Sequence, residues 1–205
     1  MSKAFDRNQL LAAFDEIGAA AVAAHARLDI AVFGGSALML ASNFRFSTED
    51  VDIAEIGQPW PGWLSDVVAR IATRHGWTED WLNDAVTFFL SPVAQSQRDM
   101  VIWGTFPRAA DKTGLTVFLP TARYMLALKL KALRVAKFEK GTKDLADVAG
   151  LLRVLEITDA DEAIGILLEF YPNSAADAEK ARFVLRQVLS TEGPLDAPRY
   201  PRRDV

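Results

Sequence analysis

The chain has 205 residues, of which 50% are hydrophobic, and it carries a formal net charge of −4 at pH 7. This size and composition suit a globular domain with a sizeable core, and the negative charge argues against a protein that coats nucleic acid through global electrostatics, so we expect no DNA binding. The absence of cysteine excludes disulfides and thiolate metal sites and fits the reducing cytoplasm, where we expect the protein to reside.

In chain order, the apolar spacing and the glycine and proline positions predict alternating helices and strands. The first half predicts a helix over 8–28, a strand over 30–33, a helix over 37–41, a strand over 51–54 and a helix over 64–75. Residues 77–90 stay unassigned, because 81–84 are typical of a turn or cap and 86–90 fit either a strand or a helix. No apolar run approaches the about 20 residues that cross a bilayer, and the N-terminus lacks the layout of a signal peptide, so we expect neither membrane contact nor secretion.

The second half predicts two strands that we expect to pair as a hairpin, and then a series of helices. The strands lie over 100–106 and 115–119, and the helices over 120–138, 142–155, 159–171 and 175–189. Gly141 and Thr142 separate the first two helices, because glycine commonly ends a helix and threonine caps the next. We therefore expect an α/β (α+β) fold: a small mixed sheet flanked by helices in residues 1–119, a C-terminal helical bundle in residues 120–192 packed on it, and an irregular tail over 193–205.

A glycine turn joins the first predicted strand to the helix that follows it. Gly34 and Gly35 let the backbone approach a ligand closely, and Ser36 adds a hydroxyl near the helix N-terminus. Backbone amides at such a turn bind phosphate oxygens. Gly-Gly-Ser turns are also common outside binding sites, so this motif alone indicates a nucleotide site only weakly.

Two carboxylates stand two residues apart where the second predicted strand begins. In extended backbone, Asp50 and Asp52 point to the same side of the chain. Mg²⁺ prefers hard oxygen ligands and usually takes one or two carboxylates together with substrate phosphates. The pair therefore predicts a Mg²⁺ site, with two solvated aspartates as the alternative reading.

A lysine falls on the apolar side of the predicted helix over 120–138. At 100° per residue, Lys129 lies in the middle of an arc of leucines, alanines and a methionine. Burying an ammonium group without a partner costs several kcal/mol, so we expect Lys129 to meet a carboxylate or a bound phosphate. Asp144, which borders the apolar face of the next helix, is the candidate partner, and either a structural ion pair or a catalytic role fits this pattern.

Basic residues are concentrated between 129 and 143. The stretch contains one acid, Glu139, and the cations Lys129, Lys131, Arg134, Lys137, Lys140 and Lys143. On the wheel Lys131 and Arg134 lie on the polar side, where we expect them to be solvated. The stretch is either a solvated surface or a local contact for an anionic partner.

Together these motifs resemble a known superfamily. A strand, Gly-Gly-Ser, a helix and then, about 15 residues later, Asp-x-Asp between Val51 and Ile53 resemble the signature of the DNA-polymerase-β-like nucleotidyltransferases. The runs that follow are similar to the AbiEii-type toxins of type IV toxin–antitoxin systems and to related bacterial nucleotidyltransferase-like proteins: GGSALML, Arg45-x-Ser47-Thr48-x-Asp50-Val51-Asp52, WLND over 81–84, LPTARYMLALKLKALR over 119–134 and KDLADV over 143–148. The resemblance covers most of residues 29–170.

The resemblance implies a nucleotidyltransferase fold and a Mg²⁺-dependent transfer of a nucleoside monophosphate from an NTP to an acceptor hydroxyl. It implies tRNA as an acceptor, an antitoxin as a partner, and a site made of Ser36, Asp50, Asp52, Lys129 and Asp144. A small-molecule acceptor is the second enzymatic reading. A catalytically degenerate fold that binds nucleotide or regulates a partner is the rival from another class.

One departure from the family pattern bears on that rival. Many members carry a third carboxylate on a later strand, where it activates the attacking hydroxyl, but residues 115–119 contain none. Asp99, just before the strand over 100–106, and Asp144 are the two candidates for this role. His25 and His75 have no metal-ligand spacing, and we interpret both as structural.

Overall fold

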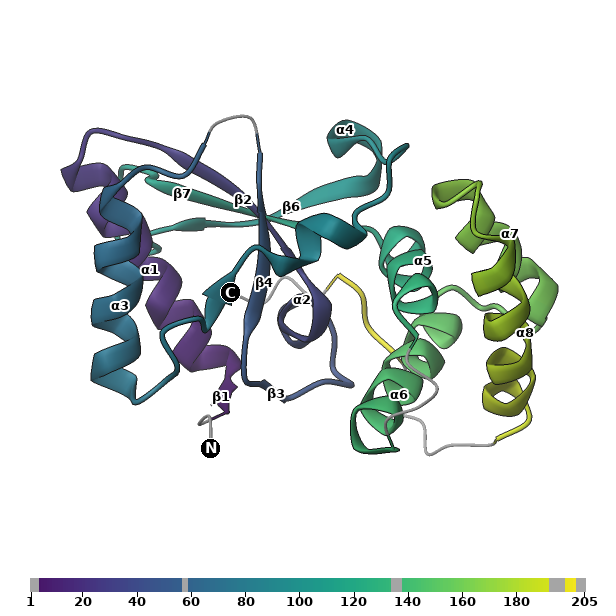
Figure 1. The fold of residues 1–205 in the computed structure, drawn as a ribbon. Coiled ribbons are helices and arrows are strands. Elements are labelled where there is room, and N and C mark those ends of the chain that lie inside the picture. Colours follow the sequence, from purple (N-terminus) through teal and green to yellow (C-terminus); the bar gives the residue numbers. More distant parts are fainter. Residues whose placement is uncertain (1–3, 57–58, 134–137, 192–197, 202–205) are drawn as a thin grey trace.

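The computed structural model describes residues 4–56, 59–133, 138–191 and 198–201, and its mixed α/β fold is drawn in Figure 1. The helices are α1 (Arg7–Ala23), α2 (Gly34–Ala41), α3 (Trp63–His75), the 3-10 helix η1 (Ala85–Phe89), α4 (Ser96–Asp99), α5 (Ala122–Lys131), α6 (Phe138–Val154), α7 (Ala160–Phe170) and α8 (Ala175–Leu189). The strands are β1 (Phe5–Asp6), β2 (Leu28–Phe33), β3 (Ser47–Thr48), β4 (Val51–Glu55), β5 (Leu82–Asn83), β6 (Met100–Phe106) and β7 (Leu115–Pro120).

The main sheet has five strands in the order β5-β4-β2-β7-β6, and β1 pairs with β3 separately. Strand β2 is parallel to β7 and antiparallel to β4, so the sheet is mixed, as predicted. Strands β6 and β7 are antiparallel neighbours, which confirms the expected hairpin pairing. Because Phe33 pairs with Asp52, the glycine turn that follows β2 lies beside the beginning of β4.

Helices cover the sheet on both sides. In Figure 1, α1 and α3 lie together on one side, and α2 lies on the side toward α5, α6, α7 and α8. The four C-terminal helices contact one another, and aromatic rings join them to the sheet. The ring of Tyr124 on α5 lies edge-on to Phe33 at 6.1 Å and stacks on Phe170 of α7 at 4.9 Å. One continuous hydrophobic cluster runs through the sheet and the helical part.

Two helices end earlier than the sequence predicts. Helix α1 ends at Ala23 instead of 28, because β2 already begins at Leu28. Helix α5 ends at Lys131 instead of 138, although the composition favours a longer helix. The Lys180 ammonium group of α8 donates to the carbonyl of Leu133, which follows the last residues of α5. This contact stabilises the C-terminal end of α5.

The predicted break at Gly141-Thr142 is wrong, because α6 begins at Phe138 and continues through both positions. Glycine inside a helix costs only about 1 kcal/mol, which tertiary packing overrides. The unassigned segment 77–90 forms β5 and η1. In the tail, residues 198–201 form neither helix nor strand, and the Tyr200 hydroxyl donates to the Pro120 carbonyl at 2.5 Å. Within the described ranges, no helix has the length and apolarity needed to cross a bilayer.

Candidate functional site

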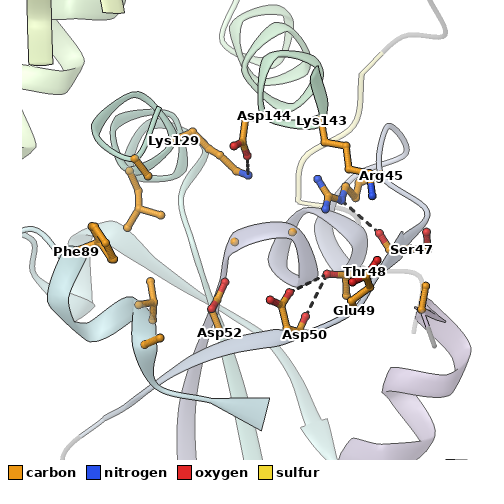
Figure 2. Close-up of a pocket in the computed structure, with 17 residues that line it drawn as sticks. Arg45, Ser47, Thr48, Glu49, Asp50, Asp52, Phe89, Lys129, Lys143 and Asp144 are labelled. Atoms are coloured by element: carbon orange, nitrogen blue, oxygen red, sulfur yellow. Dashed lines mark hydrogen bonds and ion pairs between the residues drawn. The ribbon is translucent and has the colours of Figure 1, made fainter. Parts of the chain in front are cut away.

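A cavity of about 350 Å³ lies where the glycine turn, the segment from Arg45 to Asp52, η1, α5 and the beginning of α6 meet. Figure 2 shows its polar side chains converging from these elements. Six of the seven predicted site residues line it, namely Gly34, Gly35, Asp50, Asp52, Lys129 and Asp144, and Ser36 does not. The sheet register explains why Gly34, Gly35, Asp50 and Asp52 lie together, because the pairing of β2 with β4 brings the turn and the Asp-x-Asp segment side by side.

Both turn glycines lie close to charged side chains of the cavity. Gly34 has φ +63°, and a Cβ atom there would lie 2.3 Å from the Oδ2 atom of Asp52. A Cβ atom at Gly35 would lie 2.6 Å from the Nη2 atom of Arg45. A side chain at Gly34 would be strained by this φ, and a Cβ atom at either position would force the end of the Asp52 or Arg45 side chain to shift. The backbone of the turn therefore lies close to the Asp52 carboxylate and to the Arg45 guanidinium.

The side chain of Ser36 does not reach the cavity. It is 1% exposed, and its hydroxyl donates to the Phe33 carbonyl at 2.8 Å. This bond satisfies the hydroxyl inside the first turn of α2, so Ser36 supports the shape of the turn. Its predicted contact with phosphate is not made by the side chain in this arrangement.

The two aspartates differ in their surroundings. Asp50 is exposed and accepts a hydrogen bond from the Thr48 hydroxyl at 3.3 Å. Burial, followed by the neighbouring charge of Asp50, raises the pKa of the Asp52 carboxyl to about 6, and the charge of Lys129 opposes this rise. The site thus holds an ionised carboxylate under electrostatic strain, which a cation would relieve.

The donor set fits a hard divalent cation. Asp50 and Asp52 offer carboxylate oxygens on one side of the cavity. Nowhere in the described residues do three or more histidine or acidic side chains gather as a complete metal cage. Two carboxylates, with the remaining positions filled by water and substrate phosphates, are the arrangement in which Mg²⁺ usually binds.

Lys129 is 8% exposed and meets two carboxylates. Its Nζ atom lies 2.9 Å from Oδ1 of Asp144, the partner expected from the sequence, and 2.7 Å from Oδ2 of Asp147. Asp147 is 1% exposed and also contacts Nη1 of Arg45 at 2.8 Å. The lysine therefore belongs to a network of two cations and two carboxylates on the side of the cavity opposite Asp52.

Sequence reasoning missed Arg45 and Asp147. A signal for Asp147 exists, because it stands beside Val148 on the apolar face of α6, and a carboxylate on such a face needs a charged partner. Arg45 lies in a loop without periodicity, and only its place in the motif before Asp50 could have indicated a role. Its contact with Asp147 spans 102 positions in the sequence.

The opposite wall of the cavity is apolar. Val86 and Phe89 of η1 and Leu128 of α5 line it. The C-terminal helices hold η1 in place, because the Tyr171 hydroxyl donates to the Phe89 carbonyl at 2.7 Å. The cavity therefore combines a charged half with a half suited to a flat apolar group.

Asp99 does not line the cavity, which removes it as the substitute for a strand-borne carboxylate. Its oxygens accept hydrogen bonds from the Arg98 guanidinium and from the backbone amide of Gln95, each at 2.8 Å. The Arg98 guanidinium holds the pKa of this carboxyl below its usual range. Asp99 instead fixes the turn at α4 before β6.

The basic stretch is not a uniform solvated surface. Lys131 is half-buried and contacts Asp177 at 2.6 Å, so the expectation that it is solvated was wrong. Lys129 faces the carboxylates described above, whereas Lys143 is exposed at the cavity. Arg134 and Lys137 lie outside the described residues, and the description does not extend to the side chain of Lys140.

Comparison with family models, with curated proteins and with solved structures gives no match to this chain. The geometry of the cavity and the motifs in the sequence are therefore what indicate a function.

Proposed function

We propose that the protein is a Mg²⁺-dependent nucleotidyltransferase that transfers a nucleoside monophosphate from an NTP to an acceptor hydroxyl. The observation that carries this proposal is the convergence of a glycine turn, the Asp50/Asp52 pair and Lys129 around one cavity of about 350 Å³. A volume of that order suits a small ligand. Each group has a separate task in binding and activating a triphosphate.

The nucleotide is oriented by the two halves of the cavity. Backbone at Gly34 and Gly35 approaches the phosphates, Lys129 and Arg45 supply positive charge, and the nucleobase lies against the apolar wall that contains Phe89. Asp50 and Asp52 hold Mg²⁺, which when bound neutralises the charge of the phosphates.

The reaction is an in-line displacement. The acceptor oxygen forms a bond to the α-phosphorus, the bond from this phosphorus to the bridging oxygen breaks, and pyrophosphate leaves. The hydroxyl proton passes to a carboxylate, and Glu49 and Asp144 are the lining carboxylates that remain besides the metal-binding pair. Positioning and charge neutralisation supply most of the acceleration in such transfers.

For the acceptor we propose an RNA, with tRNA as the first to be examined. Lys143 stands exposed at the cavity and can contact the phosphate backbone of an RNA held there. The resemblance to type IV toxins also suggests an antitoxin partner. Growth inhibition on expression that Asp52→Ala abolishes would support a toxic activity and the need for such a partner.

The testing experiment measures transfer of label from each α-labelled NTP, with Mg²⁺, to total tRNA, to the protein and to small-molecule acceptors. Asp50→Ala/Asp52→Ala removes the metal-binding pair. Asp66→Ala/Asp80→Ala is the matched control, because both of these aspartates are exposed and lie outside the cavity lining. We expect label on RNA with the native chain and the control, and none with the first variant.

A nucleotide-binding module without turnover is the second candidate. The specific observation in its favour is that Asp144, the best-placed base, is paired with Lys129 at 2.9 Å. NTP binding without label on any acceptor would favour this candidate and refute the transferase. Label confined to a small molecule would keep the transferase and refute the RNA acceptor.

A further inference from the structure

A buried carboxylate lies behind the charged half of the cavity. Asp147 of α6 is 1% exposed and does not itself line the cavity. Its Oδ2 atom lies 2.7 Å from Nζ of Lys129 and 2.8 Å from Nη1 of Arg45. One carboxylate oxygen thus joins two cations from separate elements, α5 and the loop after α2.

Both cations face the cavity, although their shared partner does not. The Nη2 atom of Arg45 lies so close to Gly35 that a Cβ atom there would be 2.6 Å from it. The guanidinium therefore reaches from Asp147 to the glycine turn. Lys129 enters from α5, as Figure 2 shows, on the side opposite Asp50 and Asp52.

The two carboxylates on Lys129 differ in access to solvent. The side chain of Asp144 is 27% exposed and lines the cavity, whereas that of Asp147 is 2% exposed. An entering phosphate can replace a carboxylate at the cavity surface. It cannot replace Asp147 without leaving a buried charge unpaired, which is strongly unfavourable.

We propose that Asp147 is a positioning residue that fixes Arg45 and Lys129 as a two-cation clamp for phosphates, and that Lys129 exchanges Asp144 for a phosphate oxygen when triphosphate binds. This proposal rests on the proposed function for the identity of the ligand. Release of Asp144 leaves a carboxylate facing the cavity. Asp144 is then able to accept the proton of the acceptor hydroxyl, so base activation follows nucleotide binding.

The test is the affinity for inorganic tripolyphosphate, measured by titration calorimetry without metal, for the native chain and for the isosteric variants Asp144→Asn and Asp147→Asn. Both variants remove one negative charge, so simple electrostatic attraction would tighten binding in both. The clamp predicts opposite effects. We expect Asp147→Asn to bind at least about tenfold more weakly, and Asp144→Asn about two- to fivefold more tightly.

Glu49→Gln is the matched control, because Glu49 is an exposed carboxylate in the cavity lining and, among the described residues, forms no ion pair with either cation. We expect it to tighten binding slightly, as charge removal alone should. Circular dichroism and thermal unfolding establish that each variant is folded. If Asp147→Asn does not fold, Arg45→Gln replaces it, since this variant keeps the contact of Lys129 with Asp147 and should also weaken binding.

The clamp is overturned if the native chain does not bind tripolyphosphate. It is also overturned if Asp147→Asn, or Arg45→Gln in its place, binds tripolyphosphate as tightly as Glu49→Gln does. Equal weakening by Asp144→Asn and Asp147→Asn also overturns it, because a merely structural network predicts that result. The proposed function fails separately. If Asp144→Asn and Asp147→Asn change the affinity for tripolyphosphate in opposite directions but the native chain transfers no nucleotide, the clamp is supported and the transferase is refuted.

Discussion

Replacing Asp52 by asparagine should make the metal-free protein more stable while removing its proposed activity. Burial and the charge of Asp50 raise the pKa of the Asp52 carboxyl from 3.8 to about 6. Between these two values the folded protein binds more protons than the unfolded chain. Stability therefore falls as the pH rises through about 4 to 6, and it stays reduced at neutral pH.

The magnitude follows from the size of this pKa difference. For a group sealed from water, it corresponds to a loss of about 3 kcal/mol at pH 7.5. The Asp52 side chain is only partly buried, so solvent screening reduces the loss to about 1–2 kcal/mol. Asparagine has nearly the same shape and no charge. Asp52→Asn should accordingly raise Tm by about 2–8 °C in a domain of this size.

The assay is thermal unfolding in EDTA from pH 4 to pH 8, for the native chain, Asp52→Asn and Glu49→Gln. Glu49 is an exposed carboxylate three positions away and controls for the removal of one negative charge. The gain from Asp52→Asn should be largest above pH 6 and should vanish toward pH 4. A gain that does not depend on pH, or a lower Tm at pH 7.5, would refute the reasoning.

The remaining predictions concern the same cavity. Mg²⁺ at about ten times its Kd should stabilise the native chain by about 1.4 kcal/mol and leave the Tm of Asp52→Asn unchanged, as measured by calorimetry. Gly34→Ala should destabilise the fold by about 1–3 kcal/mol and abolish the response of Tm to Mg²⁺, because its Cβ atom would meet Asp52 at 2.3 Å and its φ is +63°. Tyr171→Phe, which removes the bond to the Phe89 carbonyl, should cost about 1 kcal/mol in denaturant unfolding and weaken NTP binding more than tripolyphosphate binding.

Much of the fold could be predicted from local patterns. Strand β6 and helix α8 have the predicted bounds, and α3 differs by one residue. Gly62 and Gly76 mark the ends of α3, and Pro107 follows β6. The expectation that Lys129 meets Asp144 came from one helical wheel and the next helix, and the contact is present at 2.9 Å. Local periodicity was sufficient where an element packs along its whole length.

The rest depends on contacts that no local pattern contains. Helix α5 stops early where Lys180 binds the Leu133 carbonyl, and this lysine is 47 residues away in the sequence. The loop residue Arg45 acquires its place only through Asp147. At Ser36 the motif predicts a ligand contact, whereas in the structure the hydroxyl donates to the carbonyl three residues earlier, a bond that the motif did not indicate.

The distribution of charge around the cavity is difficult to explain by stability alone. Asp52 has a raised pKa, and Lys129 and Asp147 are buried charges in a network. Apolar residues of similar volume often replace such buried pairs without loss of stability. Under the proposed function a charged ligand would change this balance, because a divalent cation would stabilise the ionised Asp52 and a phosphate would take the position of Asp144 on Lys129. Binding would then recover the free energy that these groups cost the fold, and substitutions at the site should for that reason separate stability from function.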